Sequence, residues 1–375
     1  MKPLLLSLAL LAATSTPATA VANAAAPQPK ALLIVSSEGR DGGQTRPGFE
    51  MDEFAQAYLV LRANGIAVEV ASPAGGAVEA DKFNNEDDHI QALMADAQAQ
   101  QLLKNTRRTQ DIKAGEHQAI LVVGGKGAMF DLPKDAALTK LLGQHFEQGG
   151  VLGAVCHGPA VLAAVNLKDG TPLTKGRRIT GFTNEEEEVF GKKWVKEFPF
   201  LIETRMREQG AKWEEAPLML PKLVVDGRLI TGQNPFSTAQ VAEAVVRSLG
   251  RTPVQRAMFR EERSMQLVTR WLAGERQEAK AQLDADPKQY KTDLIAMLGY
   301  YQAKAATTDA ARRDALSVMQ FAEPYMKHPR LQLGIAQTQA ALGEVAAARE
   351  RLTALVARDP KFADAHKALA ALPAQ

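Results

Sequence analysis

The chain has 375 residues, of which 46% are hydrophobic and 23% are charged. These fractions are close to globular averages and exclude wholesale disorder and fibrous architecture. At roughly 100–200 residues per domain, the length indicates two globular units. Lys and Arg number 45 against 43 Asp and Glu, a net charge of +2, so we expect no nucleic-acid partner.

Cys156 is the single cysteine, and the six histidines show no closely spaced pair. One cysteine excludes an intramolecular disulfide and a zinc site made of four cysteines. We therefore expect neither a metal nor another cofactor.

The N-terminus has the pattern of a secretory signal. Lys2 precedes an apolar run from Leu4 to Ala13, and small residues suited to cleavage follow at Ala18-Thr19-Ala20 and Ala22-Asn23-Ala24. An apolar core of this length is too short to stay as a membrane anchor. We expect residues 1–24 to be a signal peptide and the mature protein to be periplasmic or secreted, without a membrane span. A retained N-terminal helix is the alternative.

Residues 25–250 alternate short apolar strands with helices, which predicts an α/β domain with a doubly wound parallel sheet of the flavodoxin-like type. Residues 75–116 are polar and lack strand signals, so we expect an insertion above the sheet. Helices are predicted over about 50–64, 136–145 and 238–249. The candidate strands are 31–36, 67–71, 119–123, 151–155, 178–180, 223–225 and 228–231.

Residues 255–375 contain few β-branched runs and many strong helix formers, so they predict a separate all-α domain. Gly343, Ala348, Leu352 and Pro360 have the spacing of a tetratricopeptide unit, and the start of that spacing recurs upstream at Gly274. We expect a helical-repeat, tetratricopeptide-like domain, with an ordinary helical bundle as the alternative.

The segment Val151-Leu-Gly-Ala-Val-Cys156-His157-Gly158-Pro159 places a cysteine directly after an apolar strand and before a predicted helix. A reactive side chain on such a turn has the layout of a nucleophile elbow. The helix N-terminus behind Cys156 is expected to favour the thiolate. A buried structural cysteine at a strand end is the alternative interpretation.

The chain resembles the ThiJ/PfpI superfamily of class I glutamine amidotransferase-like proteins, and within it the glyoxalase III/chaperone branch. The resemblance covers about residues 31–250. It rests on the cysteine segment, on Gly124-Gly125-Lys-Gly127 with Phe130-Asp131-Leu-Pro133, on Ile179-Thr-Gly-Phe-Thr-Asn184, and on Asp226-Gly-Arg-Leu-Ile-Thr-Gly232 with Asn234-Pro235.

The resemblance implies a catalytic set. Cys156 is expected to be the nucleophile and His157 its base. Glu53 corresponds to the family's glutamate beside the sulfur, where it should be largely protonated, and Glu187 corresponds to the acid that orients the histidine, with Glu186 as the next choice.

The other acids of these two segments are expected to be solvated. Glu50 and Asp52 read as exposed acids at a helix start. The four consecutive glutamates, 185–188, read first as an exposed helix start capped by Thr183 or Asn184.

The resemblance also implies an oxyanion hole made by backbone N–H groups at Gly125 and His157. Gly124-Gly125-Lys126-Gly127 lacks the Ser or Thr that a P-loop needs after its lysine, which argues against nucleotide binding. Lys126 stands where this branch commonly has histidine.

The function implied is glyoxalase III-type conversion of methylglyoxal or glyoxal to hydroxy acids, a lyase activity of the D-lactate dehydratase type without glutathione, in a stress-protective protein. The alternatives are an amidase or peptidase related to glutamine amidotransferases, and a chaperone or deglycase that does not turn over aldehydes. A protein or peptide partner on the C-terminal helices and a homodimer are further expectations.

Overall fold

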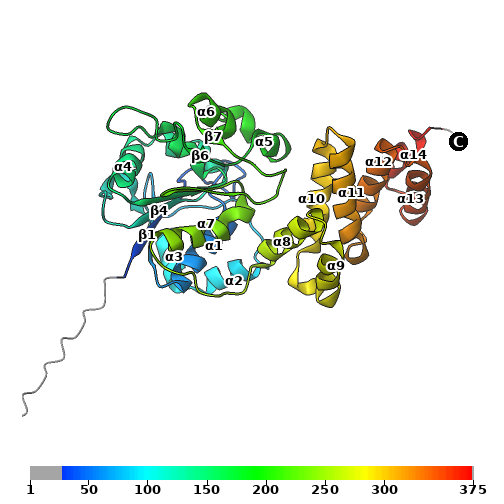
Figure 1. Cartoon of the computed structure of the whole chain (residues 1–375), viewed down its shortest axis with the longest axis horizontal. Coiled ribbons are helices and arrows are strands. Elements are labelled where there is room, and N and C mark those ends of the chain that lie inside the picture. The colour runs from blue at the N-terminus through cyan, green and yellow to red at the C-terminus, as the bar shows by residue number, and fades with distance from the viewer. Residues whose placement is uncertain (1–27, 374–375) are drawn as a thin grey trace, which may run out of the picture.

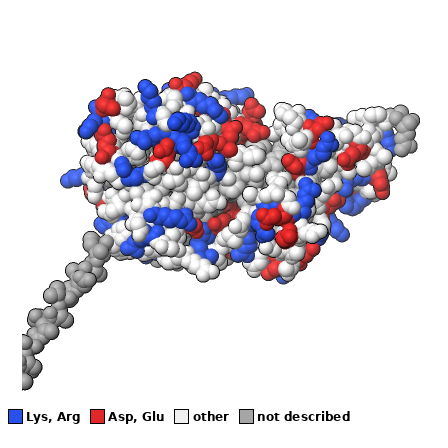
Figure 2. Space-filling model, viewed as in Figure 1, with Lys and Arg blue, Asp and Glu red and all other residues white. Residues whose placement is uncertain are grey.

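The computed structural model describes residues 28–373 and shows an α/β domain followed by a helical region (Figure 1). The expected signal peptide lies outside the described residues. Lys and Arg side chains are interspersed with Asp and Glu over the face seen in Figure 2. Among the described residues, no helix combines the length and the apolar composition needed to cross a membrane.

The main sheet has seven strands in the order β3-β2-β1-β4-β5-β9-β8. All neighbours are parallel except β8 and β9, which form an antiparallel pair at one edge. The sheet is therefore mostly rather than wholly parallel. Its strands are β1 (Lys30–Ile34), β2 (Ala67–Ser72), β3 (Arg107–Arg108), β4 (Ala119–Val122), β5 (Val151–Val155), β8 (Leu223–Asp226) and β9 (Leu229–Gly232).

Two predictions about strands are corrected. The candidate at 178–180 forms β6 (Arg178–Ile179), which pairs with β7 (Lys212–Trp213) in a separate small sheet. The short strands β3 and β7 were not predicted, because two polar residues carry no period-two hydrophobic pattern.

Helices cover both faces of the main sheet (Figure 1). On one face, α1 (Met51–Ala63) and α7 (Thr238–Ser248) share a buried core with β1, β2 and β4. On the other face, α4 (Ala136–Glu147) and α6 (Ile202–Glu208) contribute to a second buried core, and α5 (Asn184–Phe190) lies next to α6. The three predicted helices correspond to α1, α4 and α7.

The segment 75–116 is not an insertion above the sheet. It contains α2 (Asp88–Ala95) and α3 (Ala97–Lys104), which bury Ile90 and Leu103 in the same core as α1. It then supplies β3 to the edge of the sheet. This segment is therefore part of the layer that carries α1.

The helical region holds seven α-helices within the described residues. Gly274 and Gly343 both have positive φ, at the joints α8–α9 and α12–α13, which gives these two pairs the same connection. The tetratricopeptide assignment stays a prediction. The helices are α8 (Arg260–Leu272), α9 (Arg276–Ala285), α10 (Thr292–Ala305), α11 (Asp309–Ala322), α12 (Pro329–Ala341), α13 (Val345–Arg358) and α14 (Ala363–Ala370).

The helical region packs directly on the α/β domain. Leu218, Met219 and Leu220 of the α/β domain belong to the same buried apolar cluster as the side chains of α8 to α12. Gln302 on α10 donates a hydrogen bond to the carbonyl of Leu218 (2.9 Å). Phe190 on α5 meets Tyr301 on α10 edge to face, with ring centroids 5.0 Å apart. A shared core with polar contacts fixes α10 beside the loop that carries Met219.

Candidate active site

Cys156 lies at a sharp turn immediately after β5. Its φ is +59°, in the left-handed region that non-glycine residues rarely adopt. The turn is held by its neighbours, because the N–H of Cys156 donates to the carbonyl of Gly232 (3.0 Å) and the N–H of Phe182 donates to the carbonyl of Cys156 (2.9 Å). The strained backbone confirms the predicted elbow and presents Sγ at the carboxyl end of the sheet, where ligands bind in such folds.

A chain of close contacts runs from the sulfur to Glu187. Cys156 Sγ lies 3.2 Å from Nδ1 of His157, and His157 Nε2 lies 3.0 Å from Oε1 of Glu187. All three side chains are buried. When Nε2–H donates to Glu187, Nδ1 keeps its lone pair directed at the sulfur. The structure thus brings together the predicted nucleophile, base and orienting acid.

Aromatic rings hold the imidazole in place. His157 stacks on Phe182, with ring centroids 4.4 Å apart, and meets Phe198 edge to face at 5.9 Å. Packing on two sides leaves the ring little rotational freedom, so its two nitrogen atoms stay aligned with Cys156 and Glu187.

Glu186 has a different structural role from Glu187. It forms a capping box with Thr183 at the start of α5, and its Oε1 accepts from Asn234 Nδ2 (2.9 Å), from Gln233 Nε2 (3.2 Å) and from the N–H of Met219 (3.3 Å). Burial raises the pKa of Glu186 to about 7 despite these hydrogen bonds. The 185–188 run is therefore only partly solvated, and the Thr183-x-x-Glu186 spacing was the signal for this role.

Glu53 lies on α1 and is fully buried beside the thiol. Its Oε2 accepts from the N–H of Gly124 (2.6 Å), while Oε1 has no hydrogen-bond partner within residues 28–373. Burial raises the pKa of Glu53 to about 8, although hydrogen bonds with Cys156 and Gly124 act in the opposite direction. A pKa of about 8 keeps Glu53 largely protonated at neutral pH, as expected for a carboxyl group buried beside the cysteine.

The surroundings of Cys156 oppose the thiolate that the sequence was expected to favour. Burial raises the pKa of the Cys156 thiol well above its usual range, and the charge of Glu53 and a hydrogen bond with it raise the pKa further. The segment behind the elbow, Gly158–Ala164, is a 3₁₀-helix rather than the start of an α-helix. The direction of the pKa shift favours the neutral thiol, and Nδ1 of His157, 3.2 Å from the sulfur, is placed to accept its proton.

The Gly124-Gly125 loop packs against the elbow. A Cβ on Gly124 would lie 2.7 Å from the N atom of His157 and 2.8 Å from both Cys156 Cβ and Glu53 Oε2, so only glycine fits. The N–H groups of Gly125 and His157 find no acceptor in the described part of the chain. Both residues line the space in front of the sulfur, and Lys126 lies beside them.

That space, the catalytic cavity, has a volume of about 200 Å³ and is lined by Cys156, His157, Gly125, Glu186, Glu50 and Met297, among others. Glu50 was expected to be an exposed acid, but it is half-buried at this wall. Burial raises the pKa of Glu50 well above its usual range, and the nearby Asp52 and Glu53 raise it further. Met297 belongs to α10, so the helical region contributes one wall.

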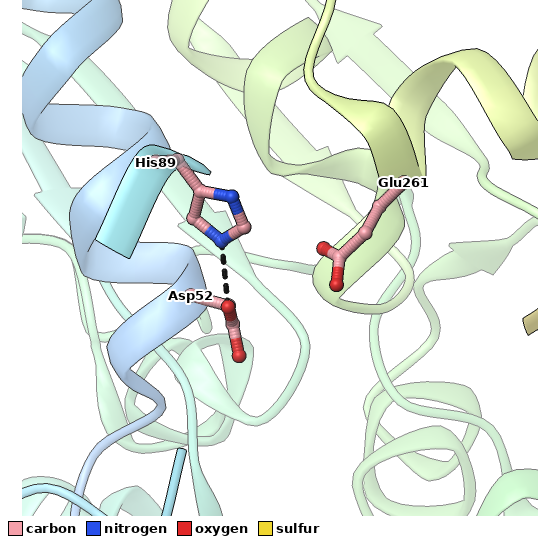
Figure 3. A group of neighbouring side chains, drawn as sticks. All are labelled: Asp52, His89 and Glu261. Carbon is pink, nitrogen blue, oxygen red and sulfur yellow. Dashed lines mark hydrogen bonds and ion pairs between the residues drawn. The ribbon is translucent and has the colours of Figure 1, made fainter. Parts of the chain in front are cut away.

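Asp52, His89 and Glu261 form the one group within the described residues whose spacing could hold a metal ion (Figure 3). His89 Nε2 lies 2.6 Å from Asp52 Oδ1. Both oxygens of Glu261 already have partners, since Gln56 Nε2 donates to Oε2 (3.2 Å) and Lys291 Nζ donates to Oε1 (2.8 Å). These contacts make the group an ionic link between α1, α2 and α8. Asp52, expected to be an exposed acid, is thus engaged in this link.

The family model of the DJ-1/PfpI family matches residues 45–248. The chain belongs to the DJ-1/PfpI family. Glyoxalase 3 of Candida albicans is 32% identical over 234 residues, covering 58% of this chain and 97% of that protein. The glutathione-independent glyoxalase HSP31 of Saccharomyces cerevisiae is 30% identical, covering 57% of this chain and 94% of that protein.

Solved structures agree with this assignment. The crystal structure of glyoxalase III from Candida albicans aligns with a TM-score of 0.54 and 28% identity, covering 59% of this chain and 97% of that one. The 24 kDa rapid encystment protein of Francisella tularensis aligns with a TM-score of 0.56 and 29% identity, covering 59% of this chain and 99% of that one. These relatives match little more than the length of the α/β domain.

Proposed function

We propose that the protein is a glutathione-independent glyoxalase that converts methylglyoxal to lactate through a covalent intermediate on Cys156. The observation that carries the proposal is the contact chain Cys156–His157–Glu187 with the protonated Glu53 beside the sulfur. The likeness to glutathione-independent glyoxalases supports the same activity.

In the first step, Nδ1 of His157 takes the thiol proton as Sγ bonds to the aldehyde carbon, C1, of methylglyoxal. The imidazolium then returns this proton to the former aldehyde oxygen, which gives a neutral hemithioacetal. Glu187 holds the ring and stabilises its charged form throughout. Because the thiol is neutral at rest, the proton transfer and the attack on carbon are coupled.

In the second step, His157 removes the hydrogen of C1 and delivers it to C2, so the hemithioacetal becomes a lactoyl thioester through an enediolate. Glu53 and the N–H groups of Gly125 and His157 would donate hydrogen bonds to the developing oxygen charge. Water then hydrolyses the thioester, releasing lactate and the thiol. Methylglyoxal and one water molecule give one lactic acid, without net oxidation or reduction.

To test this activity, the purified protein is given methylglyoxal, glutamine or an unfolded client protein in separate assays, in the absence of glutathione. We expect methylglyoxal to be consumed with formation of an equal amount of lactate. Release of ammonia from glutamine without lactate formation would instead support the amidase alternative. Suppression of the aggregation of an unfolded client protein, with neither product, would support the chaperone alternative.

We also propose that the protein is exported and protects against reactive aldehydes outside the cytoplasm. The support is the pattern of residues 1–24, a short basic start, an apolar core and small residues for cleavage. Cell fractionation of the full-length chain and of a chain without residues 1–24 tests this. Finding the full-length chain entirely in the cytoplasm would contradict export.

A further inference from the structure

A second, larger space adjoins the catalytic cavity. This interdomain groove has a volume of about 550 Å³ and lies between the α/β domain and helices α10 and α12. Glu50, Pro235, Phe236 and Met297 line both spaces. The groove therefore begins at the wall of the catalytic cavity, and Met297, which is 41% exposed, stands at the junction.

The groove presents mainly apolar groups. Leu294, Tyr301 and Leu331 line it together with Phe236 and Met297. Its acidic lining is largely neutralised, because Asp52 is paired with His89 (Figure 3). Glu261 is likewise paired with Lys291.

At the rim of the groove, the exposed Asp293 and Arg330 carry opposite charges. The lining therefore favours an uncharged, apolar ligand over a strongly charged one.

Methylglyoxal leaves this groove unused. A volume of 200 Å³ corresponds to roughly seven water molecules at about 30 Å³ each, which is enough for the small skeleton of methylglyoxal beside Cys156. The groove alone lies within the range of about 300–1,000 Å³ that is usual for sites of larger organic ligands. An apolar space of this size beside the reacting atoms is suited to the remainder of a longer substrate.

We propose that the helical region completes the substrate site, and that the interdomain groove binds the alkyl or aryl tail of an α-oxoaldehyde larger than methylglyoxal. This inference rests on the proposed glyoxalase activity and names its substrate class. The aldehyde carbon stays beside Cys156 and the tail extends past Met297. The Glu50 carboxyl makes no hydrogen bond to another residue within 28–373, so it is free to contact the second carbonyl of the substrate.

The wall that α10 supplies is fixed in place. The contacts of Tyr301 with Phe190 and of Gln302 with the Leu218 carbonyl hold α10 against the α/β domain. Lys291, just before α10, joins Asp87 to Glu261 with two contacts of 2.8 Å. Because this wall is already in place, binding of the tail does not require a segment of the chain to become ordered. The apolar contacts of the tail in the groove therefore stabilise the transition state.

The test compares kcat/KM for methylglyoxal and isobutylglyoxal in the wild-type protein and in Met297→Trp. We expect the wild type to favour isobutylglyoxal by at least about tenfold, the lower end of the effect of added apolar groups in a pocket. In Met297→Trp the indole obstructs the junction, so kcat/KM for isobutylglyoxal should fall at least about tenfold more than kcat/KM for methylglyoxal. Met94→Trp, at an exposed position on α2 outside both spaces, is the matched control.

Equal kcat/KM values for both aldehydes in the wild type, or an equal loss for both in Met297→Trp, would overturn the inference. If the groove binds a peptide partner instead of the substrate tail, the wild type should show equal kcat/KM values for the two aldehydes.

A binding measurement keeps the inference separate from the proposed activity. By calorimetry, the wild type should bind hydroxyisocaproate at least about tenfold more tightly than lactate, and Met297→Trp should lose this difference. If neither aldehyde is turned over, the proposed function fails, and this comparison still supports or overturns the binding of apolar tails in the groove.

Discussion

Met297 on α10 and Cys156 after β5 line the same cavity, although they come from the two halves of the chain. The helical region is thus a structural part of the site rather than an appendage joined by a linker. Its contacts converge on the loop that carries Met219, which itself lines the cavity and donates to Glu186. Substitutions that alter the packing of the helical region should therefore change the surroundings of the Cys156 sulfur.

Removing the charge of Glu187 tests the orientation of the base. We expect Glu187→Gln to lower kcat for methylglyoxal by about 10²–10⁴-fold, the usual contribution of a positioned acid or base. KM should change little, because Glu187 does not line the catalytic cavity. Glu188→Gln, at the exposed neighbouring position, is the control, and an equal loss of kcat in this variant would refute the assignment.

Glu53→Gln tests the role of the protonated acid. The amide oxygen can still accept from the N–H of Gly124, but the amide N–H is a weaker hydrogen-bond donor to the developing oxygen charge than the carboxylic acid, so we expect kcat to fall by up to about 100-fold. In the wild type, activity should decline as pH rises through about 8, where Glu53 ionises. Rate measurements between pH 6 and about 9.5 check this, and a wild-type rate that keeps rising past this range would contradict the role of Glu53.

The same variant should be more stable than the wild type at alkaline pH. The folded state keeps the Glu53 proton up to about pH 8, whereas the unfolded state releases it near its ordinary pKa of about 4.3. Between about pH 4.3 and about pH 8 the unfolded state therefore binds fewer protons than the folded state, so the free energy of unfolding falls as pH rises. At roughly 1.4 kcal/mol per pKa unit, the cost by pH 8 is on the order of 3–5 kcal/mol.

Urea unfolding at pH 5 and pH 8 measures this effect. The difference in unfolding free energy between Glu53→Gln and the wild type should shift by a few kcal/mol in favour of the variant between the two pH values. A difference that does not depend on pH would show that Glu53 is ionised in the native protein.

Gly124→Ala tests the close packing of the elbow. The added methyl group would meet Glu53 Oε2, Cys156 Cβ and the His157 N atom at 2.7–2.8 Å, so at least one of these must move. A displacement of this size in a catalytic group should lower kcat about 100-fold. Gly170→Ala, where a Cβ has open space despite a positive φ, should cost about 1 kcal/mol of stability without loss of activity.

Lys291→Met tests the ion pairs by which Lys291 joins Asp87 of the α/β domain to Glu261 of α8. The substitution leaves the buried acids Asp87 and Glu261 without their cation, which should lower the unfolding free energy by about 3 kcal/mol. Lys280→Met, which breaks a solvent-exposed pair with Asp284, should cost less than about 1 kcal/mol. Equal effects of the two variants in urea unfolding would show that the buried link contributes no more than a surface pair.

The sequence predicted those parts of the site that depend on local pattern. The apolar strand before Cys156 and the turn residues after it were sufficient to predict the elbow. The resemblance selected Glu187 over Glu186, and the structure places Glu187 against His157. Glu186 was harder to predict, because its partners Gln233 and Asn234 are distant in sequence and meet it only in the folded chain.

Two features could not be predicted because they depend on long-range packing. The protonation of the Cys156 thiol follows from burial among Glu53, Glu50 and Glu186, and a linear pattern does not show which acids surround a sulfur. Likewise, nothing in the alanine-rich helical pattern indicated that Met297 would reach the catalytic cavity. Both depend on contacts between segments far apart in the chain.

In the proposed reaction, Cys156 itself forms the bond to the aldehyde. Proton NMR of lactate formed from methylglyoxal without glutathione, by the wild type and by Cys156→Ala at equal concentrations, tests whether this bond is required. We predict lactate from the wild type and only the uncatalysed amount from Cys156→Ala, with the same circular dichroism spectrum for both. Lactate formed at the wild-type rate by Cys156→Ala would show that Cys156 is not the nucleophile.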